Sequence, residues 1–373
     1  MHIHKTLARI TLALSLTAPL LAGTVPQAVA EDAAAPAIDA AKLASMAEDI
    51  QVRFGVTGLL IGVQQGDHAP EIVAAGTSLP GMPVTTDMHA RIGAMGISTL
   101  TTILFQLVDE GAVTLDTPLA TWFPDIMNAD KVTIGMLACS RSGYADYVRN
   151  DGFVDAYYAD VFRTWTIDEL LAITYGDSML FEPGTNFAYS HANFILLGLA
   201  LESITGTTMP GLVQSRVLGP LGLTDIAYRS TPELSEPVLA SYTAERGVFE
   251  NATYWNPSWT AHTGALSSNV ADLLGLTHGL ASGALISAES LEVMLSPINV
   301  GDGFSREGFY YGYGILVAEP WIMQTFNFAG YDGTVAYRPD QDITIAVVNT
   351  LGATLESGPS TTIIEELKAA LAP

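Results

Sequence analysis

The stretch ARIGAMGISTLTTILFQLVDEG, residues 90–111, decides the fold assignment. Between Gly93 and Gly111, apolar residues recur at helical spacing, at positions 97, 100, 104, 107 and 108. A stripe with this period indicates a helix that packs one face against a hydrophobic core. We therefore expect a buried helix that begins near Gly93.

The segments on either side of this helix predict strands and further helices. Residues 38–50 indicate a helix, and VTGLLIGVQQGDHAPEIVAAG (56–76) indicates two strands around a Gly-Asp turn. Two apolar strands, over 311–319 and 342–350, precede an amphipathic helix over 361–372. We expect an α/β (α+β) fold, in which a mixed, mainly antiparallel sheet is flanked by N- and C-terminal helices and joined by a large helical subdomain.

The first 30 residues are expected to be a signal peptide rather than part of the fold. They combine a basic start, an apolar run and the small residues AVA ending at Ala30. A lone membrane anchor is the alternative, but the apolar run is short for a span of about 20 residues. We expect an exported protein, periplasmic or extracellular, with no membrane span in the mature chain.

The rest of the chain, residues 31–373, is expected to form a single domain. Its α/β part should cover about 38–92 and 260–373, and its helical part about 93–259, because helical patterns and long loops dominate the middle of the chain.

The charge balance and the cysteine count limit the possible partners. The chain has 39 acidic residues against 15 Lys and Arg, a net charge of −24. A field of this sign repels phosphate backbones, so nucleic-acid binding is excluded. The single cysteine, Cys139, allows no internal disulfide and is a poor basis for a metal site, so we expect neither a metal nor another cofactor.

Six segments carry a resemblance that covers most of the mature chain. They occur in one order along the chain, at residues 90–125, 132–147, 181–206, 217–228, 264–276 and 326–350. In this order they resemble the penicillin-recognising serine hydrolases, which include class C-type β-lactamases, D-alanyl-D-alanine carboxypeptidases and related esterases. The resemblance implies their fold, and it implies an active site made of three motifs around one cleft.

The first motif of that family, Ser-x-x-Lys, falls on Ala94 and Ile97. In the family the Lys takes the proton of the nucleophilic Ser. Ala94 has no group that can form an acyl bond, and Ile97 cannot accept a proton. Shifting the register to Ser98 places Thr101 at the base position. None of the lysines follows a serine at this spacing; they are Lys5, Lys42, Lys131 and Lys368.

The second motif, Tyr-x-Asn, corresponds to Tyr189-Ser190-His191. One interpretation is a Tyr–His pair that moves protons near neutral pH. The other is a packed Tyr189 and a hydrogen-bonded His191 with a purely structural role. The residues alone leave both interpretations open.

The third motif, His-x-Gly or Lys-Thr-Gly, corresponds to Asn327-Phe328-Ala329. Asn327 replaces the cationic residue, and Ala329 replaces the glycine that allows close approach of the substrate. The resemblance therefore implies weakened carboxylate recognition.

A ligand cleft is nevertheless expected to persist. In the family, backbone N–H groups hold the carbonyl oxygen of the substrate, and the resemblance assigns these groups to Ala94 and Gly330. Together with Tyr189, His191 and Asn327 they predict a cleft for a small-molecule or peptide ligand.

Two other motifs are interpreted as structural. The sequence HTG at residues 262–264 lies in a segment that resembles the family's glycine-rich turn before a helix, so His262 is expected to be structural. Cys139 lies in an element that is mostly structural in the family, and we expect a free, buried thiol.

The leading hypothesis is an exported pseudoenzyme of this fold that binds a ligand or a protein partner without catalysis. An active esterase, amidase or lyase is the first alternative, using Tyr189 and His191 with a carboxylate such as Asp332. A structural or assembly module is the second alternative. No protein partner can be named from the sequence.

Overall fold

The computed structural model describes residues 39–355 and 357–372. The expected signal peptide, residues 1–30, lies outside the described residues. Within them, no single helix is long and apolar enough to cross a membrane, although the bent pair His191–Thr205 and Met209–Leu221 meets the length and composition criteria together.

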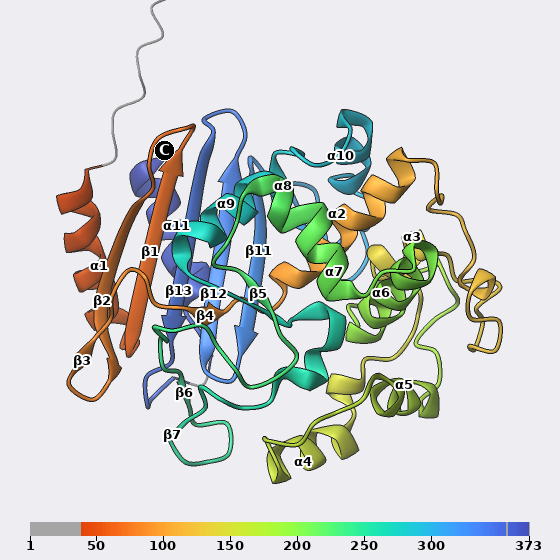
Figure 1. Cartoon of the computed structure of the whole chain (residues 1–373), viewed down its shortest axis with the longest axis horizontal. Helices are drawn as coiled ribbons and strands as arrows, with labels where there is room; N and C mark the ends of the chain where they lie inside the picture. Colours follow the sequence, from red (N-terminus) through yellow and green to blue (C-terminus); the bar gives the residue numbers. More distant parts are fainter. Residues whose placement is uncertain (1–38, 356, 373) are drawn as a thin grey trace, which may run out of the picture. The chain divides into compact units, whose positions relative to one another are not determined.

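The centre of the fold is an eight-stranded sheet in which every pairing is antiparallel (Figure 1). Its strand order is β3-β2-β1-β13-β12-β11-β10-β9. The expected mainly antiparallel sheet is therefore confirmed. The strands are β1 (Gly58–Gln65), β2 (Glu71–Leu79), β3 (Met82–Pro83), β9 (Phe309–Tyr311), β10 (Leu316–Ala318), β11 (Trp321–Phe328), β12 (Tyr331–Arg338) and β13 (Ile343–Thr350).

One expected strand is divided in two. The stretch 311–319 was expected to form one strand, but it contains the end of β9 and all of β10, which pair with each other. Between them the Gly312 N–H donates to the Ile315 carbonyl, and Gly314 has a φ of 71°. Only glycine adopts this backbone region without strain, so the two glycines make a turn where the apolar pattern predicted a continuous strand.

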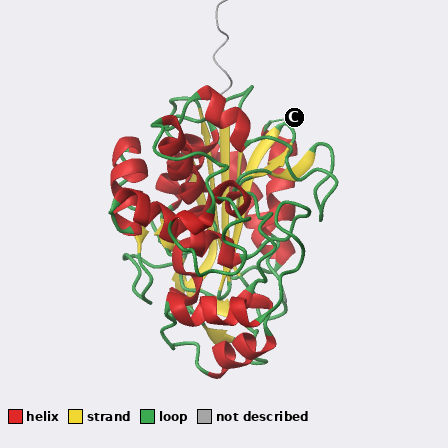
Figure 2. Ribbon diagram, turned by 90° about the vertical axis from the view of Figure 1, so that its right-hand side faces the viewer, coloured by secondary structure: helices red, strands yellow, loops and turns green. Residues whose placement is uncertain are grey.

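Helices cover both faces of the sheet (Figure 2). Successive side chains of a strand point to opposite faces of the sheet. In β1, Leu59 and Ile61 pack with α1 (Ala40–Phe54) and α11 (Ser360–Leu371). Leu60 points to the other face and belongs to the larger core there. Arg53 of α1 also pairs with Glu366 of α11, with 2.6 Å between Nη2 and Oε2. The expected N- and C-terminal helices therefore form one layer.

The other face packs against the helical part of the chain. The helices there are α2 (Met95–Asp109), η1 (Leu119–Thr121), α3 (Ile134–Ala138), η2 (Tyr147–Arg149), α4 (Asp151–Ala159), α5 (Ile167–Gly176), α6 (His191–Thr205), α7 (Met209–Val213), η3 (Gln214–Leu218), α8 (Gly219–Leu221), η4 (Pro257–Thr263), α9 (Val270–Ala281) and α10 (Ala288–Met294). Short strands in two small sheets connect them, namely β4 (Ala90–Arg91), β5 (Ala227–Tyr228), β6 (Tyr242–Thr243), β7 (Glu250–Asn251) and β8 (Leu266–Ser268).

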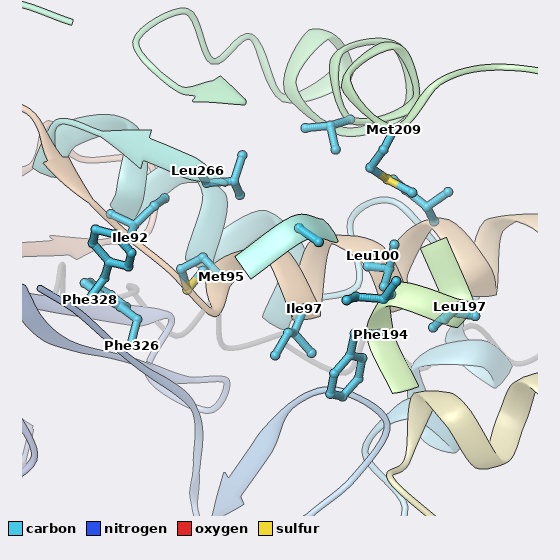
Figure 3. Packing of buried hydrophobic residues seen from close by; sticks show 14 of the residues in the cluster. Ile92, Met95, Ile97, Leu100, Phe194, Leu197, Met209, Leu266, Phe326 and Phe328 are labelled. Carbon is cyan, nitrogen blue, oxygen red and sulfur yellow. The ribbon is translucent and has the colours of Figure 1, made fainter. Parts of the chain in front are cut away.

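Helix α2 is the buried helix that the opening stretch predicts. It begins at Met95, directly after Ala94, and it contacts α6, η4 and β11. Ile97 is 1% exposed and belongs to the larger hydrophobic core. Figure 3 shows Ile97 on α2 among core side chains, which include Leu100 of the same helix and Phe194 of α6. The position that the resemblance assigns to the lysine of the family is therefore occupied by a buried side chain of the hydrophobic core.

Candidate functional site

A cavity of about 470 Å³ lies among the start of α2, the start of α6, η4, the end of β11 and the start of α11, with single residues from η2 and β12. The residues around it are Gly93, Ala94, Val148, Tyr189, His191, Trp259, Thr260, Thr263, Gly264, Thr325, Phe326, Asn327, Phe328, Asp332, Ser357, Gly358, Ser360 and Thr361. Four of the five expected cleft residues are therefore in one place, namely Ala94, Tyr189, His191 and Asn327.

The start of α2 forms one wall of the cavity. Gly93 has a φ of 37°, and a Cβ on it would lie 3.1 Å from Cβ of Phe326 and 3.9 Å from the backbone N of Asn327. Glycine at this position thus lets α2 begin close against β11. The backbone N–H of Ala94 has no hydrogen-bond partner among the residues that the structure describes.

The facing wall is β11, and its free edge also offers a backbone N–H. A two-residue turn joins β11 to β12, with Phe328 opposite Tyr331 and Asn327 opposite Asp332. In such a hairpin the residues that flank the turn exchange hydrogen bonds and the next pair does not. The N–H of Asn327 therefore points away from β12. Like that of Ala94, it has no backbone partner in the described part of the chain.

Gly330 and Ala329 do not line the cavity. They form the turn itself, with φ of 46° for Ala329 and 84° for Gly330. A Cβ on Gly330 would lie 2.0 Å from the carbonyl oxygen of Tyr242, so this residue packs against β6 instead. Asn327, and not Gly330, therefore brings a free backbone N–H to the cavity. Gly330 lies outside the cavity because the turn begins directly after Phe328, the last residue of β11.

His191 forms hydrogen bonds with the carboxylate of Asp146. The Nδ1 of His191 lies 3.2 Å from Oδ1 and 3.1 Å from Oδ2 of Asp146, and the His191 backbone N–H donates to the same carboxylate. The side chain of Asp146 is 5% exposed and that of His191 19%. Because Nδ1 is engaged, Nε2 is the ring nitrogen left for a ligand or a water molecule.

Asp146 is held in its ionised form by these contacts. Burial by itself would raise the pKa of this carboxyl, but the charge of His191 and the hydrogen bonds from His191 and the Val148 N–H outweigh it, so the pKa is lowered. The pair therefore combines a buried carboxylate with an oriented imidazole, an arrangement that fixes the tautomer of the histidine.

Aromatic rings surround His191. Its ring centroid lies 5.2 Å from that of Tyr189, 5.8 Å from that of Tyr147 and 5.9 Å from that of Trp259. Burial raises the pKa of Tyr189, so its hydroxyl is protonated at neutral pH and can donate a hydrogen bond rather than act as a base. Tyr189 also borders a second cavity of about 580 Å³, which Asp146 lines as well.

The cavity lining holds no lysine among the described residues, although it includes hydroxyl side chains such as Thr260, Thr263 and Ser360. Ile97 does not reach the cavity, and none of the lysines in the described residues lines it. Lys131 pairs with Glu182, and Lys368 is buried beside Glu365 at the sheet. In residues 39–355 and 357–372, no three His, Cys, Asp or Glu side chains gather as metal ligands.

Sequence reasoning named Asp332 as the carboxylate that could serve His191, and it missed Asp146. Asp332 lines the cavity, but its Oδ2 accepts the backbone N–H of Ser360 at the start of α11, 2.8 Å away. Asp146 lies 45 residues before His191, and its neighbours SGYADY matched the family without pointing to the histidine. Only the packing of η2 against α6 reveals this contact.

The two motifs interpreted as structural are buried. His262 is 7% exposed with Nδ1 3.3 Å from the Ile195 carbonyl oxygen, and burial lowers its pKa. Cys139 is a free, buried thiol as expected, and burial raises its pKa to about 12. The neighbours of His262, namely Thr260, Thr263 and Gly264, do border the cavity.

Comparison with known proteins supports the family resemblance. The family model described as Beta-lactamase matches residues 43–368. Penicillin-binding protein 4 of Amycolatopsis lactamdurans is 30% identical over 191 residues, 47% of this chain and 46% of that protein. The D-alanyl-D-alanine-carboxypeptidase/endopeptidase AmpH of Escherichia coli is 26% identical over 208 residues, 54% of this chain and 52% of that protein. The chain thus spans about half the length of these curated relatives.

Solved structures show the same fold over a larger share of the chain. A D-stereospecific amidohydrolase from Streptomyces has a TM-score of 0.78 at 23% identity, covering 88% of this chain and 98% of that one. A D-amino acid amidase from Ochrobactrum anthropi, in complex with L-phenylalanine, has a TM-score of 0.76 at 22% identity, covering 88% and 96%. At these identities the likeness concerns the fold.

Proposed function

The chain belongs to the beta-lactamase family, and from this premise we propose that it is a pseudoenzyme for serine acylation that binds a small carbonyl-containing ligand in the cavity. The observation that carries the proposal is the contrast at the start of α2. The backbone N–H of Ala94 is free at the cavity, whereas the nucleophile and base positions hold Ala94 and the buried Ile97.

Two free backbone N–H groups support the choice of a carbonyl ligand. The N–H groups of Ala94 and Asn327 belong to facing walls, and hydrogen bonds from both could hold one carbonyl oxygen. Such donors do not depend on side chains, so they persist when the serine is replaced. The aromatic ring of Trp259 and the hydroxyl of Tyr189 would contact the rest of the ligand.

The relatives suggest the compounds to try first. Their names refer to penicillin, to D-alanyl-D-alanine and to D-amino acid amides. We infer that an acylated D-amino acid, its amide or a penicillin is the ligand class that this cavity takes.

The test is a calorimetric titration with benzylpenicillin, D-alanyl-D-alanine and D-phenylalanine amide, with the intact mass of the protein measured afterwards. We expect saturable binding of at least one of the three and no increase in protein mass. A matched pair of variants locates the binding. Ala94→Leu fills the cavity and should abolish the heat signal, whereas Ala159→Leu, at an exposed position of α4, should leave it unchanged.

Two results would contradict the proposal. A stoichiometric penicilloyl adduct would reveal a nucleophile that the sequence does not place, and the protein would then be an acylating enzyme. Absence of binding for all three compounds, from protein with a cooperative unfolding transition, would reject this ligand class.

We further propose that the protein acts after export. The support is the N-terminal pattern that ends at Ala30. Expression of the full chain in a bacterial host, followed by N-terminal sequencing of the periplasmic fraction, should give a chain that begins at Glu31. Full-length protein that stays in the cytoplasm would refute export.

A further inference from the structure

The Asp146–His191 pair lies in a cavity that has lost the groups of serine acylation, and nothing in the binding function explains it. Asp146 is buried and ionised, His191 is partly buried, and Nε2 of His191 has no protein partner among the described residues. His191, Ala94 and Asn327 all line the same cavity. An oriented imidazole in the same cavity as two free backbone N–H groups is the set that general-base hydrolysis requires.

We propose that this cavity hydrolyses bound esters by direct attack of water, with His191 as the general base and Asp146 as its positioning residue. The proposal rests on the ligand-binding function, because the ester must first place its carbonyl oxygen on the two N–H groups. It differs from the chemistry of the family, since no acyl-enzyme forms at any step.

The reaction balances without a further reactant. Nε2 of His191 takes a proton from water as the water oxygen bonds to the carbonyl carbon. The N–H groups of Ala94 and Asn327 hold the resulting oxyanion. When the tetrahedral species collapses, the carbon–oxygen bond to the leaving group breaks and the imidazolium returns the proton to the departing alkoxide. The products are one carboxylic acid and one alcohol, and His191 is again neutral.

The small side chain of Ala94 is consistent with direct attack of water on the ester. A nucleophilic side chain at this position would compete with water for the carbonyl carbon, whereas the methyl group of Ala94 leaves space above the free N–H. Ala94 is partly buried and borders the cavity beside Gly93. The same replacement that removes acylation therefore leaves room for a water molecule.

A second His–Asp pair in the chain supplies the matched control. Nε2 of His278 lies 3.1 Å from Oδ1 of Asp342, the same separation as in the cavity pair, but both side chains are more than 40% exposed. Neither residue lines the cavity. Removing His278 thus removes an equal contact without touching the site.

The experiment measures hydrolysis of p-nitrophenyl acetate, butyrate and benzoate by the full mature chain. We expect a saturable rate above buffer for at least one ester. His191→Ala should lower kcat by about 100-fold or more, and added imidazole should restore part of it. His278→Ala should hydrolyse the ester at the wild-type rate.

Asp146→Asn separates positioning from folding. It keeps the size of the side chain and an oxygen for the His191 N–H, but it cannot stabilise the imidazolium. We expect kcat to fall by roughly 10- to 100-fold while KM changes little, because ground-state binding does not use this residue. The unfolding midpoint of each variant, measured alongside, shows that the lost rate comes from folded protein.

Three outcomes would overturn the inference. They are a rate in His191→Ala equal to that of the wild type, an absence of turnover with all three esters, and a stoichiometric acyl adduct in the intact mass. The first two leave the binding function standing if the titration with benzylpenicillin or the D-amino acid compounds succeeds. The third rejects both proposals, because it requires a protein nucleophile.

Discussion

The wall at the start of α2 and the wall at the start of α6 differ in the groups that they offer to a ligand. At the start of α2 the residues are Ala94 and Ile97, and the helix contributes only backbone donors and hydrophobic packing. At another wall of the same cavity, at the start of α6, a buried carboxylate and an imidazole are held together and surrounded by aromatic rings. The difference teaches that hydrophobic packing alone holds this helix in place, because Ile97 extends the core. The hydrogen-bonded His–Asp pair, by contrast, depends on residues from two elements, η2 and α6.

Introducing the Ser-x-x-Lys motif of the family into α2 should give the largest effect and should not produce acylation. Ile97 is 1% exposed among apolar neighbours, so a lysine there has no polar partner. We expect Ala94→Ser with Ile97→Lys to lower the free energy of unfolding by about 3–5 kcal/mol. Urea unfolding measures the loss, and intact mass after incubation with a fluorescent penicillin should show little or no adduct.

Ala94→Ser alone is the control for this experiment, and it should keep nearly wild-type stability. If the double variant were stable and acylated rapidly, the start of α2 would still have the geometry of an active site. The start of α2 would then differ from an active site only in the side chains at positions 94 and 97.

The second prediction concerns Asp146 and its dependence on pH. Its pKa is lowered in the folded protein, so the unfolded chain binds more protons and the carboxylate adds stability above its unfolded pKa of about 4. That contribution is lost as the pH falls through the lower, folded value. At pH 7 we expect Asp146→Asn to reduce the free energy of unfolding by about 3 kcal/mol. The gap to the wild type should narrow below pH 4, as urea unfolding at pH 7 and pH 3 will show.

Asp342→Asn is the comparison for this second prediction, since it breaks the exposed His–Asp pair. We expect it to change stability by less than about 1 kcal/mol, because an exposed pair is screened by water. Equal losses in the two variants would mean that burial does not distinguish the pairs.

The third prediction tests strain in η4, which forms a further wall. Ala261 has a φ of 43° and a ψ of −122°, a backbone region that side chains with a Cβ rarely adopt. Ala261→Gly should therefore raise the free energy of unfolding by about 1 kcal/mol, measured by urea unfolding. Ala200→Gly, inside α6, should lower it by about 1 kcal/mol. A loss at both positions would show that the backbone of Ala261 is not strained.

The smallest effect is expected at Asn327, where the backbone rather than the side chain faces the ligand. Its side chain is exposed. Asn327→Ala should therefore change the stability by less than about 0.5 kcal/mol. The Kd for whichever of the three titrated compounds binds should stay within about twofold. A much larger loss of binding would assign recognition to the amide side chain instead of the N–H.

The antiparallel sheet and the buried helix α2 were predictable because each depends on a local pattern. Strands show alternation or apolar runs, and α2 shows a helical stripe that continues through Ile97. The division of 311–319 into β9 and β10 was missed, because an apolar run does not show that Gly314 makes a turn. The site was predicted only in part, since Ala94, Tyr189, His191 and Asn327 meet at the cavity while Gly330 does not.

The sequence by itself determined which side chains stand at the two positions that the resemblance assigns to the nucleophile and the base. The absence of a hydroxyl at Ala94 and of an amine at Ile97 is a covalent fact that no folding changes. The tertiary structure alone decided which carboxylate reaches His191 and which backbone N–H faces the cavity. The first depends on the contact of two segments 45 residues apart, and the second on the register of the β11–β12 hairpin. Neither leaves a mark in the local sequence, because hydrogen-bond alternation and long-range packing arise only when the strands and helices are assembled.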